Sequence, residues 1–522
     1  MNAANGQLQS IDFAVLVAYM LGVFGLGCWF ARKSGTTNEF MAAGRSLPGW
    51  AVGLSVFGTF VSSIGFLGNT GKAFSGTWNS WVFGLSMPIA ALVAAKYFIP
   101  IYRSGDEVSA YYHLEKRFGP WARTFALVGY LLSQIARIGS VLYVVALALV
   151  PLTGWDIKSI IVVTGILVTA YTLIGGIEAV IWTDVVQSIV LVGGALLCAF
   201  VLWFSGPGLF DVAAENGKFS LGSFSTAPST LMSESPTFWM VLIYGVFINL
   251  TNFGIDQSFV QRYVTAKTDR DAKFSVWLAC LLFPVVSALF FFIGTGLFSY
   301  AKANPEFLQQ VQASVASNLP ADTTPKEFEE KMSIEKIGDK VLPQFIVSHL
   351  PAGVAGLLIA AIFAAAMSSM DTSLNSGATL VLCDIHKRYI HPDAGERESM
   401  RVLYGATLFF GVVGTLTGLL MTRVDSALDT WWILQGAFTG GMLGLFLLGL
   451  ISRKAQNPHA VVAVSIGVLV ILWMSLKSEW LPESLAPIAN PLHPLMTNVV
   501  GASSIILVGV LAASVMKPAD QV

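Results

Sequence analysis

Charged residues are scarce in this sequence. Lys, Arg, Asp and Glu together make up 12% of its 522 residues, about half the share found in an ordinary soluble domain. Hydrophobic residues make up 55%, and the mean hydropathy is +0.69. This composition excludes a soluble globular protein of this size. The net charge of −1 points to no charged macromolecular partner, and we expect no nucleic acid.

Cysteine is also rare, and no motif for nucleotide chemistry is present. The lack of a nucleotide-binding motif counts against an ATP-driven pump, and we expect no enzyme activity. The first ten residues contain no basic region, so the first apolar stretch is expected to be a transmembrane helix and not a signal peptide. Wide spacing inside apolar segments argues against a disulfide framework or a zinc site for the four cysteines, Cys28, Cys198, Cys280 and Cys383.

Long apolar runs fill nearly the whole chain instead. A bilayer core about 30 Å thick needs about 20 apolar residues per helix, so these runs predict an all-α polytopic membrane protein with about 13 transmembrane helices. We interpret residues 1–522 as a single transmembrane transporter domain, in which the polar segment 300–349 forms an extracellular loop. The predicted spans are 11–31, 49–70, 79–102, 122–150, 157–175, 180–205, 237–256, 274–299, 350–384, 401–421, 429–451, 459–476 and 497–515.

The distribution of positive charge predicts the orientation in the membrane. One set of alternate segments carries 18 Lys and Arg residues and the other carries 10, five of which lie in the long loop 300–349. Positive charge stays on the cytoplasmic side, and long loops count least in this rule. We therefore expect a multi-pass protein of the inner or plasma membrane with its N-terminus outside and its C-terminus in the cytoplasm.

The predicted span 49–70 is interrupted near its middle. Broken helices free backbone carbonyls, which are suitable ligands for a hard cation such as Na⁺. Close packing between helices also uses small residues and explains the pattern about equally well. The glycines and hydroxyl residues concerned are Gly53, Gly58, Thr59, Ser62, Ser63, Gly65 and Gly68.

The predicted span 350–384 carries a cluster of polar residues in an otherwise apolar helix. Ser368, Asp371 and Thr372 stand at i, i+3 and i+4, so their oxygens share one face and can converge on one ion. The hydroxyls could instead bond to carbonyls one turn back. An unpaired carboxylate is costly in the membrane, so a sodium ion or a proton at Asp371 is the favoured explanation.

Two further charges lie within apolar segments. Asp184 follows the turn Gly175–Gly176 and could cap a helix, meet a basic loop or bind a cation. Arg137 lies 14 residues beyond Arg123, or roughly 20 Å into the membrane at 1.5 Å per residue. It could form a buried ion pair with Asp184 or Asp371, or its planar fork could bind a substrate carboxylate.

The span 237–256 has a second interruption, five helices after the first. Corresponding broken helices in two inverted repeats indicate a transport site at the membrane midplane. The repeats would comprise residues 49–205 and 237–451. The residues that interrupt this span are Asn249, Thr251, Asn252 and Gly254.

With these motifs the chain resembles the sodium:solute symporter family, which includes carriers of sugars, proline, pantothenate, monocarboxylates and sialic acids. The resemblance covers about residues 10–450. It implies a leucine-transporter-type fold with two inverted five-helix repeats, and sodium as the coupling ion. The motifs, in this order along the chain, are FMAAGRSLPGW, SAYYHLEKRFG, YTLIGGIEAVIWTDVVQ, NFGIDQSFVQRY and AAAMSSMDTSLNS.

The resemblance also implies ion ligands. A first sodium site would use the carbonyls of Gly58, Val61 and Ala365 and the hydroxyls of Ser368 and Ser369. A second site, found in the sialic-acid branch, would use Asp184, Ser368, Asp371 and Thr372. That branch tends to have serine where this chain has Asp371, so the site could hold its ion more strongly or bind a proton.

For the solute, the resemblance favours an anion. Arg137 matches the arginine that meets the substrate carboxylate in sialic-acid carriers, and the lysine that sugar carriers have in the seventh helix is missing here. Ser62 and Asn249 match further substrate contacts, whereas Gly65 and Gly84 stand where sialic-acid carriers have polar side chains. Sialic acid or another sugar acid is the first choice, and a neutral sugar or a monocarboxylate the alternative.

Two other classes of membrane protein are less consistent with the sequence. A channel would not need two interrupted helices with clustered cation ligands. A membrane sensor would carry a large cytoplasmic output domain, whereas only MKPADQV follows the last span. We therefore expect a sodium-coupled symporter in the lipid bilayer that imports a small organic solute by alternating access and functions as a monomer.

Overall fold

The computed structural model describes residues 9–31, 35–105, 107–205, 208–233, 235–316, 328–329, 332–423, 427–476 and 488–516. Ten helices in these ranges are long and apolar enough to cross a membrane, and a bent pair forms an eleventh span. Two shorter apolar helices cover residues 157–173 and 438–451. Each of the 13 predicted spans therefore contains an apolar helix, as the sequence predicts.

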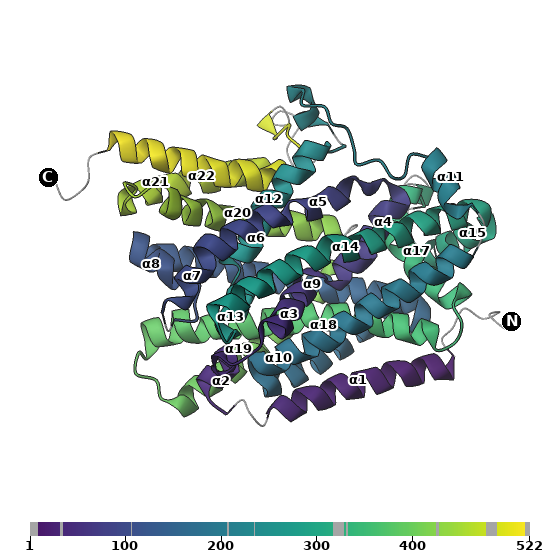
Figure 1. The fold of residues 1–522 in the computed structure, drawn as a ribbon, viewed down its shortest axis with the longest axis horizontal. Coiled ribbons are helices and arrows are strands. Elements are labelled where there is room, and N and C mark those ends of the chain that lie inside the picture. The colour runs from purple at the N-terminus through teal and green to yellow at the C-terminus, as the bar shows by residue number, and fades with distance from the viewer. Residues whose placement is uncertain are drawn as a thin grey trace.

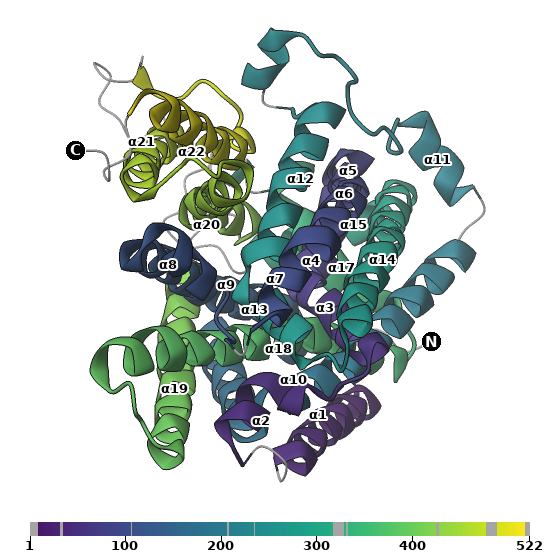
Figure 2. The ribbon, with the colours of Figure 1, turned by 60° about the vertical axis from the view of Figure 1, so that its left-hand side comes forward.

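The long helices form one bundle, in which most run roughly along the long axis of the molecule and α12 is inclined to it (Figures 1 and 2). They are α1 (Ser10–Ala31), α9 (Pro120–Thr153), α10 (Ile157–Phe204), α12 (Phe238–Ile255), α14 (Asp269–Ala303), α18 (Val354–Leu380), α19 (Glu396–Met421), α20 (Ala427–Ile451), α21 (Asn457–Ser475) and α22 (Met496–Val515).

Helix α10 contains two of the predicted spans, divided at Gly176. This glycine has φ 58° and ψ −168°, a backbone conformation that L side chains rarely adopt. A Cβ atom here would also lie 3.0 Å from the Cα of Phe40. The sequence Gly175–Gly176 thus ends the first span where a helix break is predicted.

Two spans are broken within the bundle. Helices α3 (Gly49–Phe60) and α4 (Ser63–Ser75) meet at Val61 and Ser62, and the span bends there by 51°. Helices α12 and α13 (Gln257–Thr265) meet at Asp256, whose carboxylate caps α13 by accepting from the Ser258 amide at 2.8 Å. The first break lies where the sequence predicts an interruption. The second does not, because α12 runs unbroken through Asn249, Thr251, Asn252 and Gly254 and ends only at Ile255, at the end of the predicted span 237–256. The helix accommodates these residues, and the Thr251 hydroxyl donates to the Phe247 carbonyl one turn back.

The remaining span between α4 and α9 consists of short pieces. They are η2 (Trp78–Trp81), α5 (Val82–Leu85), α6 (Met87–Val93), the π-helix η3 (Ala94–Phe98) and α7 (Ile99–Arg103). Helix α18 likewise continues as a π-helix, η5 (Val381–Ile390).

Short helices gather at the two ends of the bundle. Helices α11 (Leu209–Glu215), α15 (Pro305–Ala316) and α17 (Ile334–His349) lie at the end where α1 begins, whereas α22 ends at the opposite end near α8 (Tyr112–Phe118) (Figure 1). The predicted loop 300–349 contains α15 and α17 in its described part. Helix α17 packs on α4, where a Cβ at Gly338 would lie 2.7 Å from the Gly71 carbonyl oxygen.

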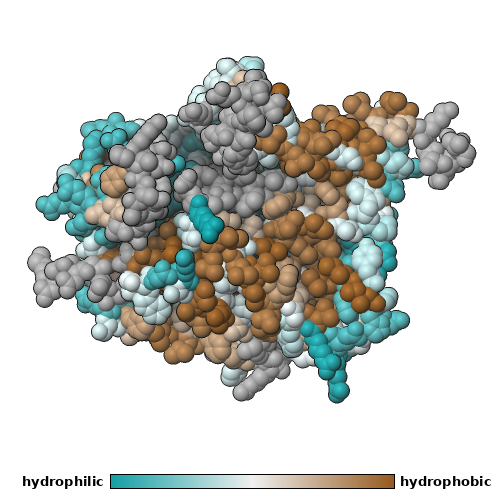
Figure 3. Space-filling view, turned by 180° about the vertical axis from the view of Figure 1, so that it is seen from behind, coloured by the Kyte–Doolittle hydropathy of each residue, from teal (hydrophilic) through white to brown (hydrophobic). Residues whose placement is uncertain are grey.

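The surface agrees with a membrane location. Hydrophobic side chains form a broad band across the middle of the molecule, and hydrophilic side chains gather toward its two ends (Figure 3). Large apolar side chains in the spans are exposed, including Leu21 at 66% and Phe200 at 61%. In water this exposure would be costly, whereas lipid covers it.

Candidate cation and solute sites

The break between α3 and α4 frees backbone oxygens. The Ser62 amide donates to the Phe60 carbonyl at 3.2 Å. It does not reach Gly58, its helical partner one turn back, so the Gly58 carbonyl is released from the helical ladder. The Val61 backbone (φ −89°, ψ 84°) is outside the helical region, which turns its carbonyl away from the α3 axis. These are two of the three carbonyls predicted as sodium ligands.

The hydroxyl ligands predicted for the first sodium site come from α18. A Cβ atom at Gly58 would lie 3.1 Å from the Ser368 Oγ and 3.0 Å from the Ser188 Oγ, so α3 and α18 touch at this point. Ser369 donates to the Ala365 carbonyl at 3.2 Å. The structure therefore brings Gly58 and Ser368 together, with Ala365 and Ser369 one turn apart on the same helix.

The second predicted site is an electrostatic cluster with a member that the sequence analysis did not include. Arg262 donates from Nη2 to the Asp184 carboxylate at 2.8 Å and to the Thr372 hydroxyl at 2.6 Å. Asp184 also accepts from Ser368 and Ser55, both at 2.5 Å. All five side chains are buried. The cluster links four elements, α3, α10, α13 and α18.

Asp371 lies beside this cluster, and its Oδ1 accepts from the Thr372 hydroxyl at 3.5 Å. Its Oδ2 accepts from the Tyr171 hydroxyl of α10 at 2.8 Å, and its side chain is fully buried. Asp184 repels its carboxylate and Arg262 attracts it. Two buried acids thus share one guanidinium, which leaves one negative charge without a matching positive charge among these three residues. A cation or a proton at Asp371 would balance it.

Arg137 has a different environment from the predicted ion pair. Asp184 is paired with Arg262, and the Nη2 atom of Arg137 donates to the Thr59 carbonyl at 2.6 Å. The strongest electrostatic attraction on its guanidinium comes from Asp256. Arg137 and Asp256 both line a large cavity, so the guanidinium is open to a ligand.

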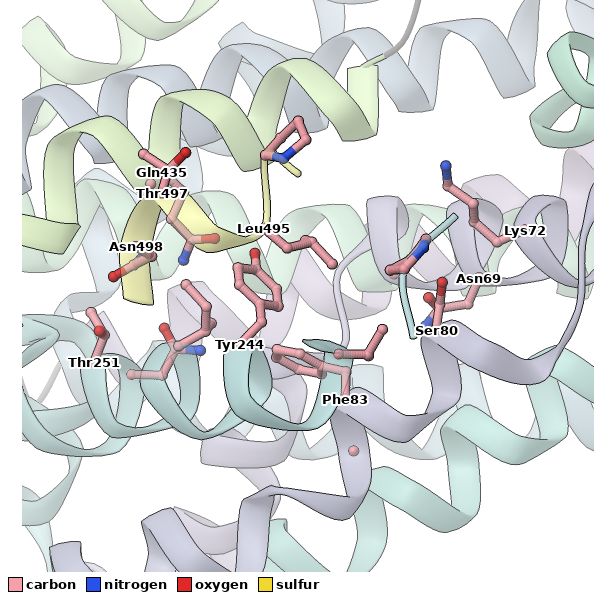
Figure 4. Close-up of a pocket in the computed structure, with 18 of the residues that line it drawn as sticks. Asn69, Lys72, Ser80, Phe83, Tyr244, Thr251, Gln435, Leu495, Thr497 and Asn498 are labelled. Carbon is pink, nitrogen blue, oxygen red and sulfur yellow. The ribbon is translucent and has the colours of Figure 1, made fainter. Parts of the chain in front are cut away.

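The cavity has a volume of about 1310 Å³. It runs from Thr59, Ser62 and Arg137 at the helix breaks to the loop residues of 220–237 and to the start of α22. Tyr244 and Thr251 of α12 face Gln435 of α20 and Asn498 of α22 across it (Figure 4). Neither polar side-chain atom of Asn498 has a hydrogen-bond partner among the described residues, so this amide can meet hydroxyl groups of a ligand.

Two predicted solute contacts differ in their placement. Ser62 lines the cavity and caps α4, where its hydroxyl accepts from the Gly65 amide at 3.1 Å. Asn249 is buried and donates to the Ser86 hydroxyl at 2.9 Å, while its neighbours Ile248 and Thr251 line the cavity. The structure thus brings Arg137 and Ser62 together on one wall, and Asn249 faces the junction of α5 and α6.

Sequence reasoning missed Arg262, Asp256 and Tyr171. Arg262 is one of the 18 Lys and Arg residues that the positive-charge count assigns to cytoplasmic segments, although its side chain is only 1% exposed. Its position six residues after the cap residue Asp256, on a helix whose sequence reads QSFVQRYVT, was the available signal. Tyr171 belongs to the apolar pattern of its span and carries no signal of its own.

The chain is similar to known membrane transporters in sequence and in structure. Residues 40–467 match the sequence model of the sodium:solute symporter family. The sodium/sialic acid symporter SiaT of Proteus mirabilis is 32% identical over 98% of this chain and 96% of its own length. The sodium/sialic acid symporter NanT of Aliivibrio fischeri is 31% identical over 97% of this chain and 94% of its own.

A solved structure has the same fold. The substrate-bound, outward-open state of a Na⁺-coupled sialic acid symporter, described as revealing a novel Na⁺ site, superposes with a TM-score of 0.82. It covers 98% of this chain and 100% of its own at 30% identity. The architecture is therefore the leucine-transporter-type fold that the motifs imply.

Proposed function

Because the chain belongs to the sodium:solute symporter family, we propose that it imports sialic acid or a closely related sugar acid together with sodium. It is a sodium-coupled secondary active symporter of the membrane and not an enzyme. The observation that carries the choice of solute is Arg137, a guanidinium on the wall of a cavity about 1310 Å³ in volume.

The solute would bind by two kinds of contact. The guanidinium would hold the carboxylate through a bidentate, charge-assisted pair, which a lysine cannot reproduce. Ser62 and Asn498 would offer hydrogen bonds to the hydroxyl groups of the sugar body. A neutral sugar would leave Arg137 without an anionic partner from the ligand, and a small monocarboxylate would leave much of the cavity unused. Both are therefore second to a sugar acid.

For sodium, we propose the first site at the α3–α4 break. The Gly58, Val61 and Ala365 carbonyls and the Ser368 and Ser369 hydroxyls would form an all-oxygen shell, which suits a hard cation. The released Gly58 carbonyl and the contact between Gly58 and Ser368 support this assignment.

We further propose a second cation at Asp184, Ser368, Asp371 and Thr372. The excess negative charge of two buried acids with one arginine supports it. Sodium at this position would keep Asp371 ionised, and Arg262 would remain as the permanent partner of Asp184. Coupling of two sodium ions to each solute follows from this arrangement.

In alternating access the binding site is open to one side of the membrane while the other side is closed. Ion pairs close one end of this molecule. Opposite the cavity mouth, Arg123 pairs with Glu115 at 2.8 Å and with Asp384 at 2.5 Å, and Arg388 also pairs with Glu115. These pairs join α8, α9 and η5. We infer that this end faces the cytoplasm and that the N-terminus is outside, as the positive-charge count predicts. The cavity would then open to the outside.

A thermal-shift screen of the purified protein tests the proposed solute. A true substrate at about 100 times its dissociation constant stabilises the folded state by about 2.7 kcal/mol. We expect stabilisation by sialic acid in sodium buffer, a smaller effect in choline buffer, and none by glucose or lactate. Stabilisation by glucose or lactate without any by sialic acid would overturn the proposed substrate.

A further inference from the structure

Three metal-ligand side chains meet at the end of the molecule that the transport sites do not use. His386 lies in η5, His391 directly follows η5, and Glu398 lies in the first turn of α19. The Nε2 of His386 is 2.9 Å from the Glu398 Oε1, and the Nδ1 of His391 is 2.9 Å from the Glu398 Oε2. The three ligand atoms all lie within 4.8 Å of one another.

The chemistry of the three groups fits a divalent transition metal. Two imidazoles and one carboxylate form a known ligand set for Zn²⁺, with a water in the fourth position. Zinc bonds of about 2.0–2.1 Å in a tetrahedron separate the ligand atoms by about 3.3 Å. The observed nitrogen–oxygen distances of 2.9 Å would therefore need to open by only a few tenths of an ångström. Small side-chain rotations provide this.

The three side chains differ in their exposure to water. The side chain of His386 is 14% exposed and so is fixed by its neighbours, whereas His391 is 52% and Glu398 40% exposed. An ion can therefore enter from the water while one ligand stays in place. The backbone between His386 and Glu398 is irregular, because η5 is a π-helix and residues 391–395 form the turn into α19.

We propose that His386, His391 and Glu398 bind one divalent transition-metal ion of the zinc class. The ion links η5, the continuation of α18, to the first turn of α19. Helix α18 carries Ser368 and Asp371, so a bound ion fixes the far end of the helix that supplies the proposed sodium ligands. The site itself is independent of the proposed function.

Direct binding of metal tests this site. The full-length protein, purified without a polyhistidine tag and stripped with a chelator, is titrated with ZnCl₂ by calorimetry and with CoCl₂ by visible absorption. We expect one ion per chain with a dissociation constant on the order of micromolar, and the intense visible bands of four-coordinate cobalt. His386→Gln and Glu398→Gln should each weaken zinc binding at least ten-fold.

His349→Gln, at the opposite end of the molecule, is the matched control and should bind zinc like the unaltered protein. Stabilisation of each variant by sodium and sialic acid, or by sodium alone, shows that it is folded. Equal zinc binding by the unaltered protein and by a His386→Gln/Glu398→Gln double variant would overturn the proposal, as would binding only at millimolar zinc.

Discussion

Two buried acids, Asp184 and Asp371, differ in how their charge is compensated. Asp184 has a permanent partner in Arg262, whereas Asp371 has a tyrosine hydroxyl and an acid nearby. A buried carboxylate without compensation is costly, so the two acids should respond differently to substitution. Asp184→Asn would weaken a buried ion pair, with a cost of about 3–5 kcal/mol when one partner is lost.

The substitution Asp371→Asn tests the second cation. With sodium bound to the carboxylate, this change should raise the sodium concentration for half-maximal uptake while expression and folding stay normal. Asp371→Ser should give a similar effect, because both variants replace a charged oxygen ligand by a neutral one. Uptake as a function of sodium, at pH 6, 7 and 8, is the measurement. A silent Asp371→Asn variant, together with pH-dependent uptake by the unaltered protein, would indicate a proton instead.

Arg137→Ala tests the anionic solute. Asp256, the acid that attracts Arg137, lines the same cavity, so the variant should fold with near-normal stability. Affinity for sialic acid should drop by about 2–4 kcal/mol, or roughly 30- to 1000-fold. Arg137→Lys should restore only part of it. Binding and melting temperature are measured on the same preparation. Normal affinity would move a neutral sugar to first place, and collapse of folding would indicate a structural ion pair with Asp256.

The hydroxyls of α18 test the first sodium site. Ser368→Ala and Ser369→Ala each remove one oxygen from the proposed shell and should raise half-saturating sodium by roughly ten-fold, the order known for weakened metal shells. Thr407→Ala on α19 is the control, since its buried hydroxyl bonds only to a carbonyl one turn back in the described structure. Unchanged sodium dependence in both serine variants would contradict the proposed first sodium site.

At the scale of elements, the break in 49–70 could be predicted at its position, and the partners across the breaks could not. Glycines and hydroxyl residues mark the break between α3 and α4, whereas the polar residues of 237–256 lie inside an unbroken α12 and the break follows them at Asp256. The pairing of Arg262 with Asp184 joins α13 to α10 over 78 positions, and no local pattern encodes it. Asn249 is a second example. The sequence shows a polar residue in this span, but it does not show which side of α12 faces the cavity.

The side chain of Lys218 joins the segment after α11 to the end of α4, beside the mouth of the cavity. Lys218, in the segment after α11, donates to the Phe74 and Gly76 carbonyls at 2.6 and 2.9 Å, at the end of α4. Burial lowers its pKa from 10.5 to about 8. In this window the unfolded chain binds more protons than the folded one, so the free energy of unfolding should rise with pH.

Burial of the charged Lys218 ammonium lowers the free energy of unfolding. This loss of stability is full below pH 8, decreases between pH 8 and 10.5, and is zero above pH 10.5. Lys218→Met removes this titration, so the melting temperature of the variant should rise less between pH 8 and 10 than that of the unaltered protein. Lys302→Met is the control, because Lys302 is bonded to the Asn216 side chain at the surface. A parallel pH profile for Lys218→Met and the unaltered protein would contradict a lowered pKa.

At the scale of the whole molecule, the proposed solute cavity and the proposed cation ligands meet at the break between α3 and α4. Ser62 and Arg137 line the cavity, and Gly58 and Val61, on the other side of the same break, belong to the proposed sodium shell. A sodium ion bound in the proposed shell would order the break and would also fix the wall to which we propose that the solute binds. Each ligand should therefore strengthen binding of the other by the same factor.

Uptake into proteoliposomes tests sodium-coupled transport of a sugar acid most directly. Purified protein is reconstituted, and radiolabelled sialic acid is supplied outside with an inward sodium gradient or with choline at equal concentration. We predict accumulation above the equilibrium level only with the sodium gradient. A sodium ionophore should abolish it, and Arg137→Ala should strongly reduce it at solute concentrations near the dissociation constant of the unaltered protein. Equal uptake in sodium and choline, or no uptake of sialic acid while a neutral sugar accumulates, would contradict it.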